Sequence, residues 1–184
     1  VIRRTRPAVC LSMGGYIAWE FWHQFPFRLR SMLLFDTRAQ ADTEEVARGR
    51  KMMAAQVVTE GVRLAVKSMV PKLIAPTTRE DQPNVAEELG DMIASTDPEA
   101  IAATQRGMAM RSDWTNQLCH VDVATLVVCG EHDGISPPDE MRGFASQMPR
   151  ARFELIAGAG HLAPLEQPEQ VNRVVRDFLG NLQD

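Results

Sequence analysis

The sequence predicts an α/β fold, in which parallel strands alternate with helices that cover the faces of one sheet. Three observations support this class. Short apolar runs recur along the chain, amphipathic stretches follow several of them, and polar or glycine-rich loops stand where the runs end. Parallel strands need a helical crossover, so the alternation favours a parallel sheet. The 184 residues suffice for one domain with a core, and 45% of them are hydrophobic.

The first elements are a strand over 8–11, a helix over 14–25 and a strand over 31–36. The first apolar run stops at Ser12, two glycines follow, and an amphipathic stretch begins at Tyr16. This pattern is typical of a strand, a sharp turn and a helix. A serine at such a turn is held in strained backbone geometry, with its hydroxyl above the sheet and a helix N-terminus behind it. Ser12 is therefore placed to act as a nucleophile.

The stretch from about 37 to 114 breaks the alternation. Its helical candidates span 43–70, 84–95 and 98–110. They are separated by prolines and by an aspartate placed as an N-cap: Pro71, Pro76, Pro83 and the pair Asp97-Pro98. Six of the ten methionines fall here, at 52, 53, 69, 92, 108 and 110. Such side chains could line a pocket for an apolar acyl group, but their spacing does not keep to one helical face and favours ordinary packing.

Strands and helices alternate again in the last third of the chain. The expected elements are a strand over 125–129, a helix over 138–147, a strand over 152–157 and a helix over 168–182. Asp133 lies in the loop just past the first of these strands, in Gly-Glu-His-Asp-Gly-Ile-Ser-Pro-Pro. His161 lies in the glycine-rich loop after the second, in Gly-Ala-Gly-His-Leu-Ala-Pro. Both are residue types that a serine nucleophile needs as partners.

The order Ser12, Asp133, His161, with each residue after a strand, resembles that of the α/β-hydrolase family and differs from the orders of two unrelated serine protease folds. The resemblance covers nearly all of the chain from the Ser12 turn onward. It implies that the chain is the C-terminal part of an α/β-hydrolase sheet with an inserted helical cap. The expected parts are a core over 1–37 and 115–184 and a cap over 38–114.

The resemblance also implies roles for these residues. His161 takes the proton from Ser12 as it attacks a carbonyl carbon, while Asp133 fixes the imidazole tautomer and stabilises the imidazolium. The N–H of Met13, directly after the nucleophile, is an oxyanion-hole donor. We expect no cofactor and no metal, because no metal-ligand spacing links the three cysteines to the four histidines.

Other polar candidates rank lower. Asp36, at the end of a strand, occupies the alternative acid position of some relatives and stands in reserve to Asp133. Glu131 and Glu166 are expected in a loop and at the cap edge, with Glu166 in an electrostatic role at the N-terminus of the last helix, which Pro168 should start. Surface or packing roles suffice for three histidines: His23, His120 and His132.

Family members carry several strands before the serine turn, and a His-Gly type loop there gives a second N–H to the oxyanion hole. Residues 1–7 are too short and too basic to replace this region, so the resemblance implies a core without its N-terminal strands. Strand 8–11 should then form one edge of a four-stranded half-sheet, where unpaired backbone groups invite pairing with a second copy. Cys10 stands at the first glycine of the pattern Gly-x-Ser-x-Gly, where its side chain could crowd the turn.

We expect a small-molecule substrate with a carboxylic ester, lactone or thioester bond. Serine as nucleophile argues against relatives that use aspartate, which are dehalogenases and epoxide hydrolases. The resemblance leaves open esterases, lactonases, thioesterases, C–C bond hydrolases and cofactor-free perhydrolases. The runs around Ser12, Asp36 and His161 resemble most the carboxylesterase and enol-lactonase branch. Arg106 or Arg111 could pair with a substrate carboxylate, although exposed helix arginines are the simpler interpretation. The alternative is a non-catalytic product, either a truncated hydrolase fragment or an interaction module with an open sheet edge.

Composition excludes other function classes. A net charge of −4 gives no sign of nucleic-acid binding, and the basic cluster Arg3, Arg4 and Arg6 is interpreted as a solvated terminus. Three cysteines are an odd number, which favours free thiols in a reducing compartment over disulfides: Cys10, Cys119 and Cys129. No leader and no run of 18 apolar residues occurs. We therefore expect no membrane insertion and a cytoplasmic location.

Overall fold

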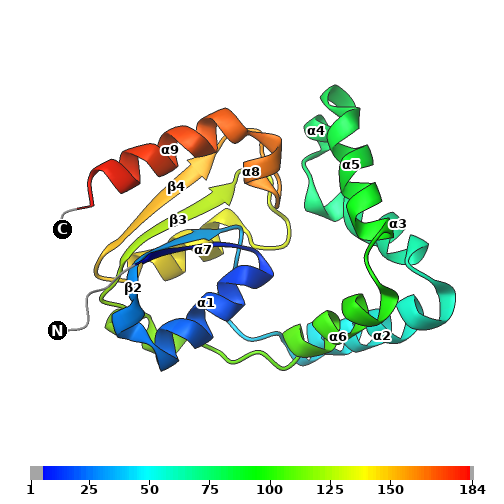
Figure 1. Cartoon of the computed structure of the whole chain (residues 1–184), viewed down its shortest axis with the longest axis horizontal. Helices are drawn as coiled ribbons and strands as arrows, with labels where there is room; N and C mark the ends of the chain where they lie inside the picture. The colour runs from blue at the N-terminus through cyan, green and yellow to red at the C-terminus, as the bar shows by residue number, and fades with distance from the viewer. Residues whose placement is uncertain (1–5, 183–184) are drawn as a thin grey trace.

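The computed structural model describes residues 6–182, and its centre is one sheet of four parallel strands in the order β1-β2-β3-β4. The strands are β1 (Arg6–Leu11), β2 (Leu29–Phe35), β3 (Ala124–Gly130) and β4 (Ala151–Ile156). Figure 1 shows β1 and β4 at opposite edges. The predicted α/β class is confirmed, and so is the prediction of four strands with 8–11 at one edge. Arg3 and Arg4 of the basic cluster lie outside the described residues.

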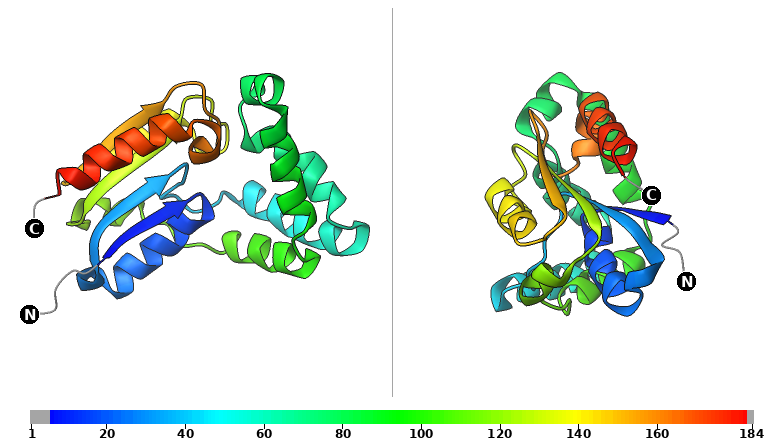
Figure 2. Two further views of the ribbon diagram at one scale, coloured as in Figure 1. Left: turned by 45° about the horizontal axis from the view of Figure 1, so that its top comes forward. Right: turned by 90° about the vertical axis from the view of Figure 1, so that its left-hand side faces the viewer.

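Helices cover both faces of this sheet (Figure 2). The helices α1 (Met13–Gln24) and α7 (Pro138–Ser146) lie on one face, and α9 (Pro168–Gly180) lies on the other. Side chains of a strand alternate between faces, so Met32 and Leu34 join the cluster with Trp19, whereas Leu33 joins that with Phe178. The two clusters thus hold the sheet between its covering helices.

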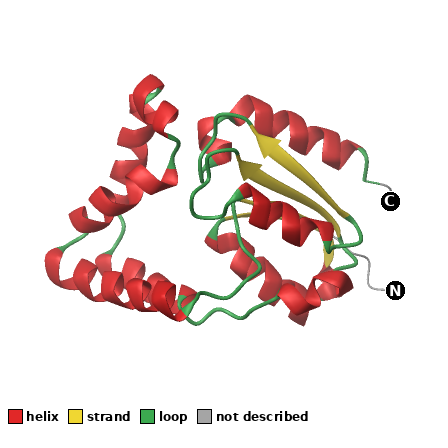
Figure 3. Cartoon of the chain, turned by 180° about the vertical axis from the view of Figure 1, so that it is seen from behind, coloured by secondary structure: helices red, strands yellow, loops and turns green. Residues whose placement is uncertain are grey.

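Five helices stand beyond the carboxyl ends of the strands, apart from the sheet (Figures 1 and 3). We call them the α2–α6 segment. They are α2 (Glu44–Glu60), α3 (Arg63–Leu73), α4 (Pro76–Asp81), α5 (Pro83–Ala94) and α6 (Pro98–Met108). Two small apolar clusters hold the segment together. Three short helices complete the fold: η1 (Pro26–Arg28), η2 (Thr115–His120) and α8 (Ala163–Glu166).

The segment differs in detail from the sequence prediction. The single helix expected over 43–70 is two helices, because Gly61 adopts a φ of +90° that ends α2. α3 continues through Pro71 to Leu73, and α4 was not expected. Pro76 and Pro83 separate helices by starting them, since the first helical position needs no N–H partner. Asp97 caps α6 as predicted and accepts a hydrogen bond from Glu99 N at 2.7 Å.

Within the part of the chain that the structure describes, β1 pairs only with β2, and its other edge carries exposed apolar side chains. Val9 is 65% exposed, and Ile17 of the neighbouring α1 is 61% exposed. A groove of about 840 Å³ is lined by β1, α1 and the residues that follow α1, and its charged lining residues are Arg6 and Arg28. Its apolar lining is Pro7, Ala8, Cys10, Ile17, Ala18, Phe21, Phe25 and Leu29. Within residues 6–182, no helix combines the length and the apolar character needed to cross a bilayer.

Candidate active site

Ser12 occupies a strained turn between β1 and α1. Its φ of 50° and ψ of −112° lie in a region that residues other than glycine rarely adopt. Three hydrogen bonds hold this geometry: Ser12 N donates to Phe35 O at 2.9 Å, and Ser12 O accepts from Gly15 N at 2.9 Å and from Thr37 Oγ1 at 2.7 Å. The predicted strand, sharp turn and helix are therefore present, with the hydroxyl at the N-terminus of α1.

The structure brings Ser12, His161 and Asp133 together in one chain of hydrogen bonds. Ser12 Oγ lies 2.8 Å from His161 Nε2, and His161 Nδ1 lies 2.8 Å from Asp133 Oδ2. A carboxylate only accepts hydrogen bonds, so the imidazole proton belongs on Nδ1 and leaves Nε2 free to accept the serine proton. His161 and Asp133 are buried, at 1% and 3% exposure, while Ser12 is half-buried.

The loop after β3 fixes the orientation of Asp133. Its Oδ1 accepts hydrogen bonds from Ile135 N at 2.8 Å and from Ser136 N at 2.9 Å. With Oδ1 engaged by the loop, Oδ2 faces His161. The Asp-Gly-Ile-Ser run thus folds around the carboxylate and presents one oxygen to the imidazole.

Asp36, the reserve acid of the sequence analysis, has a different set of partners. Its two carboxylate oxygens accept from Gly130 N at 2.8 Å and from Ala163 N at 3.2 Å. Burial raises the pKa of Asp36 well above its ordinary value; the two backbone donors act against this, and the nearby charges of Asp133 and Glu166 add to it. Asp36 thus ties the end of β3 to the loop that follows His161, while Asp133 faces the imidazole.

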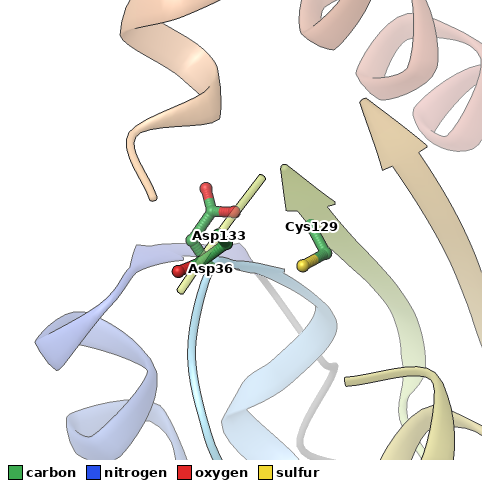
Figure 4. A group of neighbouring side chains, drawn as sticks. All are labelled: Asp36, Cys129 and Asp133. Carbon is green, nitrogen blue, oxygen red and sulfur yellow. The ribbon is translucent and has the colours of Figure 1, made fainter. Parts of the chain in front are cut away.

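Asp36, Cys129 and Asp133 gather at the carboxyl ends of β2 and β3, with ligand-type atoms within 4.8 Å of one another (Figure 4). Both carboxylates are engaged as described above. The Cys129 thiol donates to the carbonyl oxygens of Gly130 and Ser136, each at 3.4 Å. Burial raises the pKa of Cys129, so its sulfur keeps its proton at neutral pH. Because all three groups already have partners, we assign this cluster a hydrogen-bonding role.

Two further residues, Met13 and Cys10, lie beside Ser12. Met13 is the first residue of α1, so its N–H has no partner within the helix and remains available to an oxyanion. Cys10 does not crowd the turn: a Cβ placed on Gly14 would lie 3.5 Å from the Cβ of Cys10, which is ordinary contact. All three cysteines are free, with Cys10 half-buried, Cys119 exposed and Cys129 buried.

The remaining histidines lie outside this site. His23 and His120 are exposed, and the ring of His23 lies 5.0 Å from that of Trp114. His132 is half-exposed beside Glu131, whose carboxylate accepts from Gly158 N at 2.9 Å. These positions agree with the surface and loop roles predicted from the sequence.

Glu166 lies at the edge of the α2–α6 segment, but the electrostatic role predicted for it at the N-terminus of the last helix is wrong. It is 1% exposed, and its oxygens accept hydrogen bonds within the His161 loop and from the α2–α6 segment, not from the start of α9. The available signal was an acidic residue in the otherwise apolar run Leu-Ala-Pro-Leu-Glu, five residues after His161. Such a placement favours burial with partners over exposure at a helix end.

A cleft of about 480 Å³ opens beside Met13, between α1 and the end of α6. Its apolar lining includes Met13, Tyr16, Ile17, Trp19, Met108, Met110 and Trp114. Arg111 also lines it, with its guanidinium carbon 4.3 Å from the centre of the Tyr16 ring and an ion pair to Asp42. The side chain of Arg111 is 7% exposed, so the interpretation as an exposed arginine is wrong for Arg111 and correct for Arg106, which is 52% exposed.

The fold is shared with proteins of known structure. A thermophilic esterase from Thermogutta terrifontis, solved with malate bound, is 39% identical and superposes with a TM-score of 0.93; the match covers 97% of this chain and 65% of the esterase. The enol-lactonase from Burkholderia xenovorans is 25% identical, with a TM-score of 0.87 and coverage of 97% and 66%.

A curated relative extends the comparison to sequence. The putative 2-succinyl-6-hydroxy-2,4-cyclohexadiene-1-carboxylate synthase of Bacillus subtilis is 26% identical over 187 residues, which are 93% of this chain and 64% of the relative. The chain thus spans less than two thirds of the length of each of these three proteins. The model of the alpha/beta hydrolase family matches residues 2–174. With this match and a parallel sheet of the same architecture, the chain belongs to the alpha/beta hydrolase family.

Proposed function

We propose that this protein is a serine hydrolase that cleaves a carboxylic ester, lactone or thioester through Ser12, His161 and Asp133. One observation carries the proposal: the two distances of 2.8 Å that join Ser12 Oγ to His161 Nε2 and His161 Nδ1 to Asp133 Oδ2. A nucleophile, a base and a group that orients the base, within hydrogen-bond reach of one another, are the parts of nucleophilic acyl transfer.

In the proposed mechanism, Ser12 Oγ attacks the carbonyl carbon while His161 Nε2 takes the hydroxyl proton. Asp133 holds the imidazole through Nδ1–H and balances the charge of the imidazolium. The imidazolium then gives its proton to the leaving alkoxide or thiolate, and an acyl group stays on Ser12. Water, deprotonated by the same Nε2, attacks the acyl carbon and releases the carboxylic acid.

The oxyanion formed in each step needs donors aimed at the developing charge. The N–H of Met13 follows the nucleophile at the N-terminus of α1, where the helix dipole also favours negative charge. Loss of one such donor typically costs on the order of 10²–10³ in rate. The family resemblance assigns a second N–H donor to a loop that comes before the strand leading into the serine turn.

We infer that the α2–α6 segment acts as a cap and contributes to substrate choice. The cleft beside Met13 is lined by α1 and α6 and is largely apolar, which suits an acyl chain or an apolar alcohol. The names of the relatives, an esterase and an enol-lactonase, support an oxygen ester as the bond cleaved. Three free cysteines support a reducing compartment such as the cytoplasm.

The experiment is detection of fluorophosphonate labelling by intact mass, on this chain and on its Ser12→Ala and His161→Ala variants. The proposal expects one adduct on the wild type, none on Ser12→Ala and slow labelling of His161→Ala. Labelling that persists in folded Ser12→Ala, or its absence in folded wild type, would contradict the proposal. A screen with p-nitrophenyl and thioester substrates then separates the ester classes.

The open β1 edge favours a second candidate function, in which the protein is an interaction module that pairs with a second copy of itself. Edge strands present unpaired backbone groups, and here Val9 and Ile17 add exposed apolar surface beside them. A two-fold axis at this edge would join two β1 strands into one continuous sheet. Labelling of Ser12 and the oligomeric state distinguish this candidate from the first.

A further inference from the structure

We propose that Glu166 is a positioning residue that links the loop carrying His161 to the α2–α6 segment. A movement of this segment away from the loop would then displace His161 from Ser12. This inference rests on the proposed function, because it takes His161 as the base. It assigns a task to a buried carboxylate that the acyl-transfer mechanism does not use.

The contacts of Glu166 divide between two parts of the fold. Glu166 Oε1 accepts from Gly160 N at 2.9 Å and from Leu162 N at 3.2 Å, the residues on either side of His161. Glu166 Oε2 accepts from Ala75 N and from Thr78 Oγ1, each at 2.7 Å, at the start of α4. One carboxylate therefore holds the His161 loop with one oxygen and the helical segment with the other.

The backbones of the two parts also touch at this point. A Cβ placed on Gly160 would lie 2.5 Å from Ala75 N, 2.8 Å from the carbonyl carbon of Ile74 and 3.1 Å from Glu166 Oε1. Only glycine allows so close an approach. The chain before α4 thus lies directly against the residue that precedes His161, and a shift of this chain must move the loop.

Apolar contacts also join the His161 loop to the α2–α6 segment. Leu162, which caps the N-terminus of α8, and Leu165, which lies within α8, pack against the buried cluster of Ile74, Val85 and Leu89 in the helical segment. The carboxylate lies beneath this cover at 1% exposure. Charge-assisted hydrogen bonds in such surroundings are stronger than neutral ones, and the four donors compensate the buried charge.

The donors explain why the residue must be a carboxylate. All four groups that face Glu166 donate hydrogen bonds, so both of its oxygens must accept. In a Glu166→Gln variant, one side of the amide is an NH2 group, which would face either the two N–H groups of the His161 loop or Ala75 N on the helical side, where the Thr78 hydroxyl can turn to accept but Ala75 N cannot. Either the His161 loop or the helical segment then loses its acceptor, although size and shape are nearly kept.

Asp36 makes the complementary link on the core side. It holds Ala163 N, after His161, to the end of β3 through Gly130 N. Asp133 binds the imidazole itself. Glu166 differs from both because its second oxygen binds only the helical segment, which makes it the member of the three that passes a movement of that segment to His161.

The test compares Glu166→Gln and Thr78→Val with wild type, because Thr78→Val removes one donor on the helical side and leaves the His161 loop untouched. Thr59→Val is the matched control, since the Thr59 hydroxyl bonds only carbonyls of its own helix, those of Ala55 and Gln56. Two quantities are measured: the rate constant of fluorophosphonate labelling of Ser12, and hydrogen exchange of peptides spanning 74–78 and 158–166.

We expect Glu166→Gln to slow labelling about 100-fold, the order that a 1 Å misplacement of a catalytic group costs. Thr78→Val should slow it less but in the same direction and should raise exchange in both peptides. Thr78→Ser, which keeps the hydroxyl, should restore both quantities, and Thr59→Val should leave them unchanged.

The inference is overturned if Thr78→Val raises exchange at 74–78 while labelling and exchange at 158–166 stay as in wild type. Glu166 would then stabilise the contact between the His161 loop and the α2–α6 segment without positioning His161. Absence of Ser12 labelling in wild type would contradict the proposed function instead. The exchange measurement still reports in that case whether the two segments are linked, because it needs no reaction.

Discussion

Ser12 Oγ and His161 Nε2 lie 2.8 Å apart, although the two residues are 149 positions apart in the sequence and follow strands at opposite edges of the sheet. Neighbouring strands are about 4.8 Å apart, so the loop after β4 has to reach back over about 14 Å. This reach explains why several buried carboxylates fasten the loop. Asp133 binds the imidazole, and Asp36 and Glu166 bind backbone groups on the C-terminal side of His161.

Asp133→Asn is expected to lower kcat by about 10⁴-fold with an unchanged fold. The amide can donate to His161 Nδ1 and thereby favour the wrong tautomer, an effect of this size in serine hydrolase triads. Steady-state kinetics on an activated ester measure it. Asp36→Asn is the matched control, because Asp36 binds Gly130 and Ala163 and should show a much smaller loss. An equal or larger loss in Asp36→Asn would identify Asp36 as the acid.

Asp36 should make the stability of the protein depend on pH in a direction opposite to that of a paired surface carboxylate. Burial raises the pKa of Asp36 in the folded state above its unfolded value, which is about 3.9. Between these two pKa values the folded state binds more protons than the unfolded state, so the free energy of unfolding falls as pH rises. The contribution is fully present below the unfolded pKa and is lost as pH passes the folded pKa.

Urea unfolding of wild type and Asp36→Asn between pH 4 and pH 7 isolates this contribution. The free energy of unfolding of wild type minus that of the variant should increase as pH falls, with a slope of at most about 1.4 kcal/mol per pH unit for one proton. A difference that stays constant would show that folding does not shift the pKa of Asp36, and one that decreases toward low pH would show that folding lowers this pKa; either result contradicts the prediction.

The places of Ser12, Asp133 and His161 at the ends of strands could be predicted from the sequence, because each place depends on a local signal. A strand end, a pair of glycines or a glycine-rich loop places a side chain at the carboxyl edge of a parallel sheet whatever the rest of the chain does. The helix-starting prolines are local signals too, although α4, with six residues, is too short to show a period.

The burial of Glu166 and Arg111 could not be predicted from the sequence, because the partners of both side chains are distant along the chain. Glu166 accepts a hydrogen bond from Ala75 N, 91 positions away, and Arg111 is buried by Asp42 and by the ring of Tyr16. A charged residue looks exposed in a sequence until a partner is known. Buried polar contacts between the helical segment and the core therefore require the three-dimensional structure.

Met110→Glu is expected to raise KM for long-chain esters more than for acetate esters. Met110 lines the cleft beside Met13, and a carboxylate there would face an apolar acyl chain. Kinetics on p-nitrophenyl acetate and p-nitrophenyl octanoate give the ratio. Met92→Glu is the control, because Met92 is 53% exposed on α5 and does not line this cleft. Equal effects on both esters would show that the cleft does not bind the acyl chain.

Val9→Lys should weaken self-association if the β1 edge pairs with a second copy. Val9 is 65% exposed on an edge strand, and lysine on such a strand discourages pairing by placing a charge where a neighbouring strand would lie. A two-fold interface contains Val9 of both copies, and burial of each valine contributes about 1.5 kcal/mol, so the loss of both should raise the dissociation constant about 100-fold. Sedimentation velocity over a range of protein concentrations measures this constant.

Val46→Lys is the control for this prediction. It adds the same charge at a 40% exposed position on α2 and should leave association unchanged. A wild type that stays monomeric at every concentration, or a Val46→Lys variant that dissociates as readily as Val9→Lys, would contradict pairing through β1.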